Sequence, residues 1–346
     1  MYRIGCSIIF LSCLAHVHST EPVLTFELRQ FYEFMVTFGR SYKNAAEQAT
    51  RFDIFRSNLK IIEKLNNDVY DNATYGITKF ADLTADEFKR KMLHFNDTPP
   101  GISLKSPKII SGRPKIFPSR IRRFIDPSSD AHSFSWTRNP YYPPPYDQGG
   151  FDSCGHIGGV SAMSIMYSAL KRKQRNLSIQ QLIDCDPQCR DAVTYSMLFP
   201  AIRATYLATE RDYPYSGGPR ECNMAAVAKG VATISSWSLV EGESEILDKI
   251  RYGPLPAHIN GDRIQHYTGG VLRHCPNTGS NHGATIVGYG IENGVNYYLV
   301  RNTYGPDWGP EKGHLKVERG TCDIEERVYS IQILTRSPSN KCTICK

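Results

Sequence analysis

Gln148-Gly-Gly-Phe-Asp-Ser-Cys154-Gly155 is the stretch of the chain from which the fold is inferred. Apolar residues recur at helical spacing directly after it, as far as Leu170, so we expect a helix that begins at or near Cys154. The cations of Lys171-Arg172-Lys173 suit the end of that helix, where the backbone dipole is negative. The positive end of the dipole would lie at Cys154 and would stabilise a thiolate there.

Two residues farther along the chain are candidate partners of this cysteine. His282 and Asn302 follow Cys154 at roughly the 130–150 residues known for one type of cysteine nucleophile. An imidazolium stabilises a thiolate, and an asparagine amide can orient the imidazole. Gln148 could donate its side-chain amide to an oxyanion, beside the backbone N–H of Cys154. Each residue alone has an ordinary explanation, as half of a disulfide, a buried histidine or a turn cap. Only the joint spacing indicates a nucleophilic site.

Composition and charge are those of an ordinary globular protein. The 346 residues exceed the usual size of one domain, so more than one folding unit is expected. The net charge of +7 is a mild bias. The densest basic segment, Arg120-Ile-Arg-Arg123, is more simply an exposed linker or processing site than a nucleic-acid surface. Nucleic acid is therefore not an expected partner.

Residues 1–19 have the features of a secretory signal peptide. Arg3 precedes an apolar core at residues 8–11, and the segment ends in the small residue Ser19. Neither this core nor any later segment is long enough to span a bilayer. A lysosomal or extracellular protein with disulfides is expected. Acceptor sequences for N-glycosylation begin at Asn72, Asn96 and Asn176.

The rest of the chain divides by composition. Residues 25–93 have a helical pattern, and residues 94–125 resemble an extended linker and processing region. Residues 126–335 contain one early helix followed by short strands and turns, which suggests an α+β fold, and residues 336–346 form a basic tail. Six residues of the first segment recur every three or four positions and share one stripe of a helix: Glu47, Arg51, Phe55, Asn58, Ile62 and Asn66. The mixture of charged, amide and apolar groups fits a docking face as well as a core face.

These segments together resemble the papain family of cysteine peptidases, over nearly all of residues 124–333. The helical stripe matches the family's propeptide signature at every position, and Gly76-Ile-Thr-Lys-Phe-Ala-Asp82 resembles its second propeptide motif. Further matching segments lie at residues 178–185, 212–215, 281–284, 287–290 and 301–309. The resemblance implies an α+β, papain-like two-lobed fold. A helical lobe would carry Cys154, and a small β-barrel lobe would carry His282 and Asn302.

The resemblance also implies disulfides and a substrate pocket. The expected disulfides join Cys185 to Cys222 and Cys275 to Cys322. The aligned substrate-binding residues are Arg327 at the floor of the main specificity pocket, His258 at its wall, Gly283 near its mouth, and Ala192 beside the substrate backbone.

Two basic groups in that pocket would favour an acidic side chain at P2, the second residue before the cleaved bond. The alternative is that Arg327 points to solvent or pairs with Glu325 or Glu326.

The sequence departs from the family pattern around the nucleophile. Gly155 and Tyr304 replace two tryptophans, and Phe151 replaces a disulfide cysteine. A competing alignment places Cys154 on that disulfide position and leaves Ile157 in place of the nucleophile. It needs an insertion and a compensating deletion, so the gapless alignment is favoured.

The loss of that cysteine affects the other thiols. Cys189 matches the cysteine whose usual partner is lost at Phe151, so it is free or paired elsewhere, for example with the tail. Cys342 and Cys345 form a lone CxxC without a second pair or a histidine cluster. We therefore expect no metal site and no cofactor.

The resulting prediction is a monomeric cysteine endopeptidase made as an autoinhibited zymogen. Its own propeptide would lie in the cleft, and peptides or proteins would be its substrates. The alternative is a secreted pseudo-peptidase of the same fold that binds without turnover.

Overall fold

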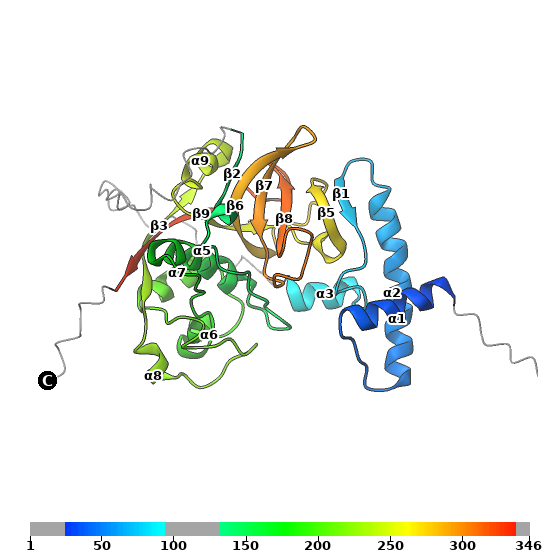
Figure 1. The fold of residues 1–346 in the computed structure, drawn as a ribbon, viewed down its shortest axis with the longest axis horizontal. Coiled ribbons are helices and arrows are strands. Elements are labelled where there is room, and N and C mark those ends of the chain that lie inside the picture. The colour runs from blue at the N-terminus through cyan, green and yellow to red at the C-terminus, as the bar shows by residue number, and fades with distance from the viewer. Residues whose placement is uncertain (1–24, 94–131, 337–346) are drawn as a thin grey trace, which may run out of the picture.

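The computed structural model describes residues 25–93 and 132–336 (Figure 1). The predicted signal peptide, the linker and all but Arg336 of the basic tail lie outside these residues. None of the helices in the described part of the chain has the length and apolar character that a membrane crossing requires.

The N-terminal unit, residues 25–93, is called the prodomain here and contains three helices and one strand. These are α1 (Phe26–Thr37), α2 (Ala45–Asn66), β1 (Asn72–Tyr75) and α3 (Ala85–Met92). Helix α1 crosses α2 at one end of the molecule (Figure 1). The rings of Phe31, Phe34 and Phe55 pack between the two helices, with centroids 5.3–6.1 Å apart. This small aromatic core holds the crossing together.

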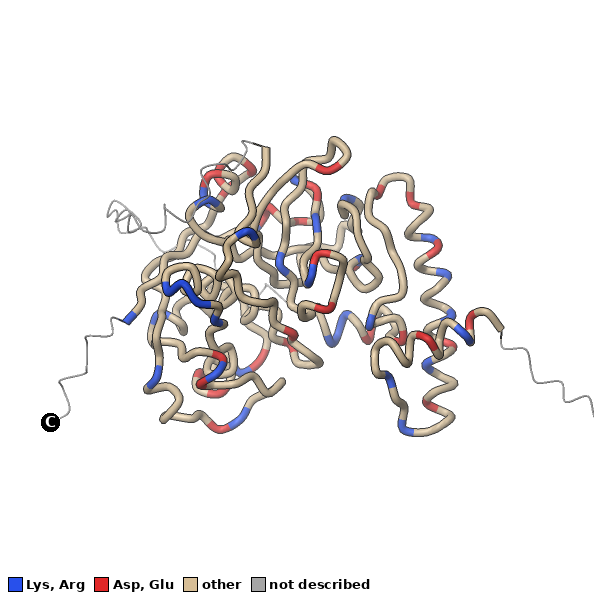
Figure 2. The backbone as a smooth tube through the Cα atoms, in the orientation of Figure 1, with Lys and Arg blue, Asp and Glu red and all other residues tan. Residues whose placement is uncertain are grey.

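The polar stripe predicted on residues 47–66 lies on α2, and its long side chains bind other parts of the prodomain. Arg51 donates two hydrogen bonds to the carboxylate of Glu87 on α3. Asn58, which is buried, donates to the carbonyls of Ala81 and Leu83. The stripe is thus a docking face for residues 75–87. Other charges of both signs are spread along the exposed part of α2 (Figure 2).

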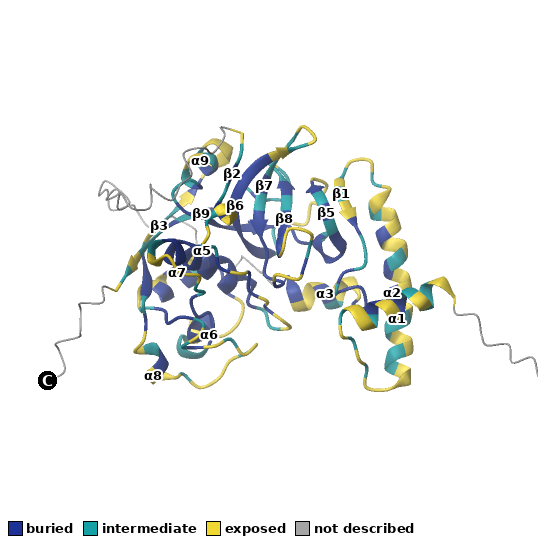
Figure 3. Ribbon diagram, viewed as in Figure 1, coloured by how far each residue is buried: buried dark blue, intermediate teal, exposed yellow. Residues whose placement is uncertain are grey.

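The helical lobe of the peptidase unit surrounds one buried helix. This helix, α5 (Cys154–Lys171), begins at the predicted residue and is buried from Cys154 to Ala169 (Figure 3). The surrounding elements are α6 (Gln180–Cys185), η2 (Pro187–Cys189), α7 (Tyr195–Arg203) and α8 (Met224–Val227), whereas η1 (Trp136–Arg138) packs against the sheet of the second lobe. Apolar residues lie on all sides of α5, and its buried Ser164 and Ser168 are hydrogen-bonded to backbone carbonyls, so the helix can lie inside the molecule.

The second lobe is built on a nine-stranded mixed sheet in the order β1-β5-β8-β7-β6-β4-β9-β3, with β2 beside β6. Its strands are β2 (Phe134–Ser135), β3 (Ala232–Val240), β4 (Leu255–Ile259), β5 (Tyr267–Leu272), β6 (His282–Glu292), β7 (Val295–Arg301), β8 (His314–Glu318) and β9 (Val328–Thr335). Helix α9 (Gly242–Lys249) and η3 (Ile264–His266) complete the lobe. The strands predicted near residues 284–289 and 296–301 are β6 and β7.

The prodomain adds a strand to this sheet. β1 pairs antiparallel with β5 at the sheet edge, as Figure 1 shows beside α2. Gly270 is needed for the pairing, because its φ is +69° and a Cβ there would lie 2.3 Å from the Asn72 carbonyl oxygen. Backbone hydrogen bonds therefore hold the two units together whatever the side chains of β1 are.

Both expected disulfides form, one in each lobe. Cys185 is bonded to Cys222, and Cys275 to Cys322. Cys154 and Cys189 are the free cysteines of the described residues, and both are buried.

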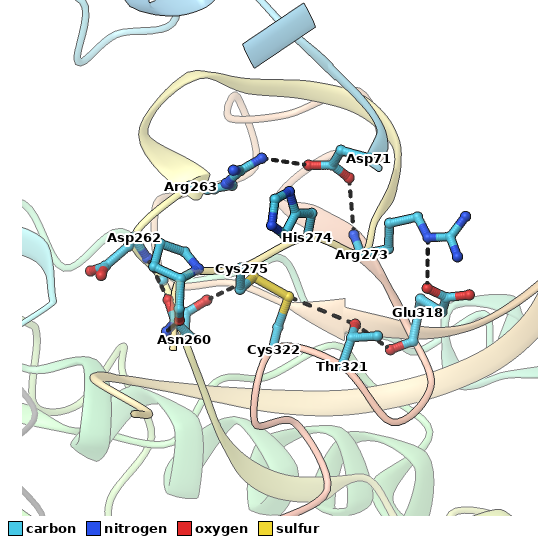
Figure 4. Close-up of a disulfide and its surroundings, with 12 residues drawn as sticks. Asp71, Asn260, Asp262, Arg263, Arg273, His274, Cys275, Glu318, Thr321 and Cys322 are labelled. Carbon is cyan, nitrogen blue, oxygen red and sulfur yellow. Dashed lines mark hydrogen bonds and ion pairs between the residues drawn. A yellow bond between two sulfur atoms is a disulfide. The ribbon is translucent and has the colours of Figure 1, made fainter. Parts of the chain in front are cut away.

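A charged cluster beside the second disulfide joins the prodomain to the peptidase unit. Arg263 lies 2.7 Å from Asp68. It also lies 3.3 Å from Asp71, which accepts a hydrogen bond from the backbone N–H of Arg273 (Figure 4). Burial tends to raise the pKa of Asp68, but hydrogen bonds from Arg263 and His274 outweigh it and lower this pKa to about 2.

Replacing Asn58 with alanine should destabilise the prodomain, because the buried carbonyls of Ala81 and Leu83 lose their shared donor. We expect the free energy of unfolding to fall by about 1–3 kcal/mol. Urea unfolding measures this when both proteins, with and without Asn58→Ala, also carry Cys154→Ala, which prevents autolysis of the full-length zymogen. Ser57→Ala, at an exposed neighbouring position, is the matched control and should change little.

The cluster around Asp68 should restrain activation even in acid. Because the pKa of Asp68 is lowered, its pairing is complete above the ordinary value of 3.8 and is lost only as the pH falls towards 2. At pH 5, Asp68→Asn should therefore convert to the mature form faster than the wild type, by about three- to tenfold. Gel analysis of a time course measures the rate. Asp53→Asn, on the exposed part of α2, should convert at the wild-type rate, and equal rates for all three proteins would contradict the prediction.

Candidate active site

Cys154 lies where the first turn of α5 meets the start of β6. Thr285 of β6 donates a hydrogen bond to the Gly158 carbonyl, at 2.8 Å. A Cβ on Gly283 would lie 2.9 Å from both the carbonyl oxygen of Cys154 and the Cα of Gly155. The two elements are thus in backbone contact, and the residue before Gly283, His282, is brought to the same end of α5.

His282 and Asn302 form the hydrogen bond that the sequence predicted. Nε2 of His282 lies 2.8 Å from Oδ1 of Asn302, and both residues are buried. Nδ1, the other ring nitrogen, has no hydrogen-bond partner of ordinary geometry within the described residues. Asn302 therefore fixes the orientation of the ring and leaves Nδ1 for proton transfer.

Burial keeps the thiol and the imidazole uncharged in this closed form. It lowers the pKa of His282 to about 4, against smaller opposing contributions from Asn302 and the Met92 backbone. It raises the pKa of the Cys154 thiol to about 12, and the carboxylate of Asp152 adds to the rise. Backbone N–H groups of Gly283 and Gly155 act in the opposite direction and favour the thiolate. The covered site therefore holds a neutral pair rather than a thiolate and an imidazolium.

The end of the prodomain covers the site. Met92 and Leu93 are 2% exposed. A Cβ built on Gly261 would lie 2.6 Å from Cδ2 of Leu93 and 3.2 Å from Cβ of His282, so these side chains adjoin one another. Gln148 Nε2 lies 3.4 Å from the carbonyl oxygen of Lys91. The prodomain thus presents a backbone carbonyl to the residue predicted to stabilise an oxyanion.

Thr303, which the sequence analysis did not identify, sets the orientation of Gln148. Its hydroxyl donates to Oε1 of Gln148, and its carbonyl accepts from the Gln148 backbone N–H at 2.8 Å. With Oε1 occupied as an acceptor, the Gln148 amide presents its donor atom to the site. In the sequence, only its position directly after Asn302 could have indicated that Thr303 belongs to the site.

Tyr304 fills the position of the expected tryptophan and is fully buried. Its ring lies 5.4 Å from that of His282 and 5.2 Å from that of Trp308, at 90° to the latter. Phe80 and Phe88 of the prodomain also pack edge-on against this ring, with centroids 5.1 and 6.0 Å away. While the prodomain is bound, the smaller aromatic ring therefore excludes water from the His282–Asn302 pair.

Three of the four predicted substrate-binding residues lie together. His258 and Gly283 are register partners on β4 and β6, and the His258 backbone N–H donates to the Arg327 carbonyl at 3.2 Å. Ala192 is exposed in the loop between η2 and α7.

The expectation of two basic groups in the pocket needs a correction. Burial lowers the pKa of His258 to about 3, so this ring is neutral. It packs on Tyr195, with ring centroids 4.7 Å apart. His258 would therefore add no positive charge to the predicted pocket. Glu325, one of the two suggested partners of Arg327, accepts hydrogen bonds from Tyr298 and the Gly320 backbone.

No group of three or more histidine, cysteine or carboxylate side chains in residues 25–93 and 132–336 is arranged to hold a metal ion. Cys154, His282, Asn302 and Gln148 bring a thiol, an imidazole and two amides to this end of α5.

Comparison with known proteins identifies both units. Residues 131–332 match the model of the papain family cysteine protease, and residues 31–88 match the cathepsin propeptide inhibitor domain. The viral cathepsin of Adoxophyes honmai nucleopolyhedrovirus is 30% identical over 325 residues, which cover 90% of this chain and 93% of the relative.

Solved structures of zymogens agree with this. Digestive procathepsin L2 from the Tenebrio molitor larval midgut has a TM-score of 0.71 and 26% identity, covering 89% of this chain and all of the other (100%). The recombinant stem bromelain precursor has a TM-score of 0.73 and 25% identity, covering 88% and 98%. The chain therefore belongs to the papain family of cysteine proteases and carries a cathepsin propeptide inhibitor domain.

Proposed function

We propose that Cys154, His282 and Asn302 are the catalytic residues of this protease, which acts as an endopeptidase once residues 25–93 have been released. The observation that carries the proposal is the end of the prodomain lying over the His282–Asn302 hydrogen bond at the start of α5. A prodomain placed in this way inhibits by occupying the position of a substrate.

The proposed reaction is acyl transfer through the sulfur. With the prodomain gone, water reaches His282 and Cys154, and the proton passes from the thiol to Nδ1. The thiolate attacks the peptide carbonyl carbon, and the oxyanion accepts hydrogen bonds from Gln148 Nε2 and the Cys154 backbone N–H. His282 then protonates the leaving amine as the C–N bond breaks. Water, deprotonated by His282, hydrolyses the thioester and releases the acid and the thiol.

The remaining features of the chain extend this proposal. A signal peptide at residues 1–19 would direct the chain into the secretory pathway, with a lysosomal or extracellular destination. Cleavage within the linker at residues 94–125 would separate the prodomain from a monomeric peptidase unit. The two disulfides support passage through an oxidising compartment.

An epoxysuccinyl thiol probe tests the nucleophile. Acid-processed wild-type protein should be labelled once per chain, because a thiolate beside an imidazolium is the reactive form. Cys154→Ala should lose the label, as measured by intact mass. Cys189→Ala removes the other free cysteine of the described chain and should keep the label. If the processed wild type stays unlabelled, the chain is a binding protein without turnover.

A peptide library tests the role of Arg327. If its guanidinium faces the substrate, glutamate at P2 should be cleaved about tenfold better by wild type than by Arg327→Gln, relative to leucine at P2. Arg211→Gln, at an exposed position, is the control. A wild-type preference for leucine or phenylalanine, unchanged in Arg327→Gln, would show that Arg327 does not select the substrate.

A further inference from the structure

A carboxylate lies directly beside the proposed nucleophile. Asp152 is two residues before Cys154, in the loop that leads into α5, and its Oδ1 accepts a hydrogen bond from the Cys154 Sγ at 3.9 Å. Cys154 is completely buried, whereas Asp152 is only partly so. Asp152 thus contacts the sulfur and also keeps part of its surface exposed to solvent.

This carboxylate lacks a cation. The groups that act on Asp152 are the Cys154 thiol and a second carboxylate, Asp191, and no lysine or arginine of the described residues forms an ion pair with it. Burial, together with the charge of Asp191, raises the pKa of Asp152 to about 7. A desolvated acid in the field of a second carboxylate is costly to ionise, and a positive charge beside it would remove that cost.

The position of the substrate follows from the places of the nucleophilic sulfur and of the amide that would stabilise the oxyanion. The attacked carbon must come within about 3–3.5 Å of Sγ, and its oxygen must face Gln148. The residue that supplies this carbonyl is P1, on the amino side of the cleaved bond. Its Cα is one bond from the attacked carbon, so its side chain begins in the neighbourhood of Asp152. A lysine or arginine at P1 is long enough to reach the carboxylate.

We propose that Asp152, assisted by Asp191, selects peptides with lysine or arginine at P1. The inference rests on the proposed function, because it places P1 relative to Cys154 as the nucleophile. A P1 cation has a second effect. The negative charge of Asp152 raises the thiol pKa, so pairing it with a cation eases formation of the thiolate. A basic substrate thus helps to activate its own nucleophile.

Two substrates that differ only in charge test the proposal. They share residues P4–P2 and a coumarin leaving group, and carry arginine or its neutral isostere citrulline at P1. Acid-processed enzyme, titrated with the epoxysuccinyl probe, should show kcat/KM about tenfold higher for arginine. Asp152→Asn should reduce the ratio to less than about threefold. Asp248→Asn, on the exposed surface of α9, should keep the wild-type ratio.

Each result supports or overturns the proposal. A wild-type ratio near one, or a high ratio retained in Asp152→Asn, overturns it while probe labelling leaves the proposed function intact. Absence of labelling in the wild type overturns both. If Asp152→Asn does not fold, Asp191→Asn decides, since this residue is exposed and should lower the ratio about two- to threefold. A ratio unchanged by Asp191→Asn would then count against the acidic subsite.

Discussion

The backbone contact between α5 and β6 is the constraint on which the rest of the site depends. Residues without side chains permit it: a Cβ on Gly283 would meet the Cys154 carbonyl at 2.9 Å, and one on Gly158 would lie 2.1 Å from the Tyr195 hydroxyl. Tyr195 donates to the carbonyls of Ala257 and Ala284, so α7 is tied to β4 and β6 under the same contact. Any larger residue would separate the lobes and move the thiol away from the imidazole.

The prodomain uses this same region, and its inhibition has two components. Sterically, residues 91–93 lie over Gln148 and His282, while β1 and the cluster around Asp68 hold the unit in place. Chemically, burial lowers the pKa of His282 to about 4 and raises that of Cys154 to about 12. A neutral thiol is a weak nucleophile, so desolvation alone keeps the covered site unreactive. Removal of the prodomain would reverse both effects.

The departures from the family pattern fit this environment. Gly155 stands where Gly283 approaches most closely, so a small residue suits the position. Tyr304 keeps an aromatic cover on His282 and offers a surface to Phe80 and Phe88. With Phe151 in place of a cysteine, Cys189 stays as a buried free thiol, while both expected disulfides form elsewhere. The hydrogen bond between His282 and Asn302 forms with these substitutions in place.

The amino-acid sequence determined the elements and the spacing of the candidate residues. The period of apolar positions after Cys154 predicted α5, and the stripe from Glu47 to Asn66 predicted α2, because helical periodicity is a local property. Only the tertiary structure decided where side chains from loops point. The neutral state of His258 and the bond from Thr303 to Gln148 depend on packing between distant segments. The contact of Asp152 with the sulfur two residues later depends on the conformation of the loop that leads into α5. Burial and direction of this kind are fixed by neighbours that no spacing along the chain specifies.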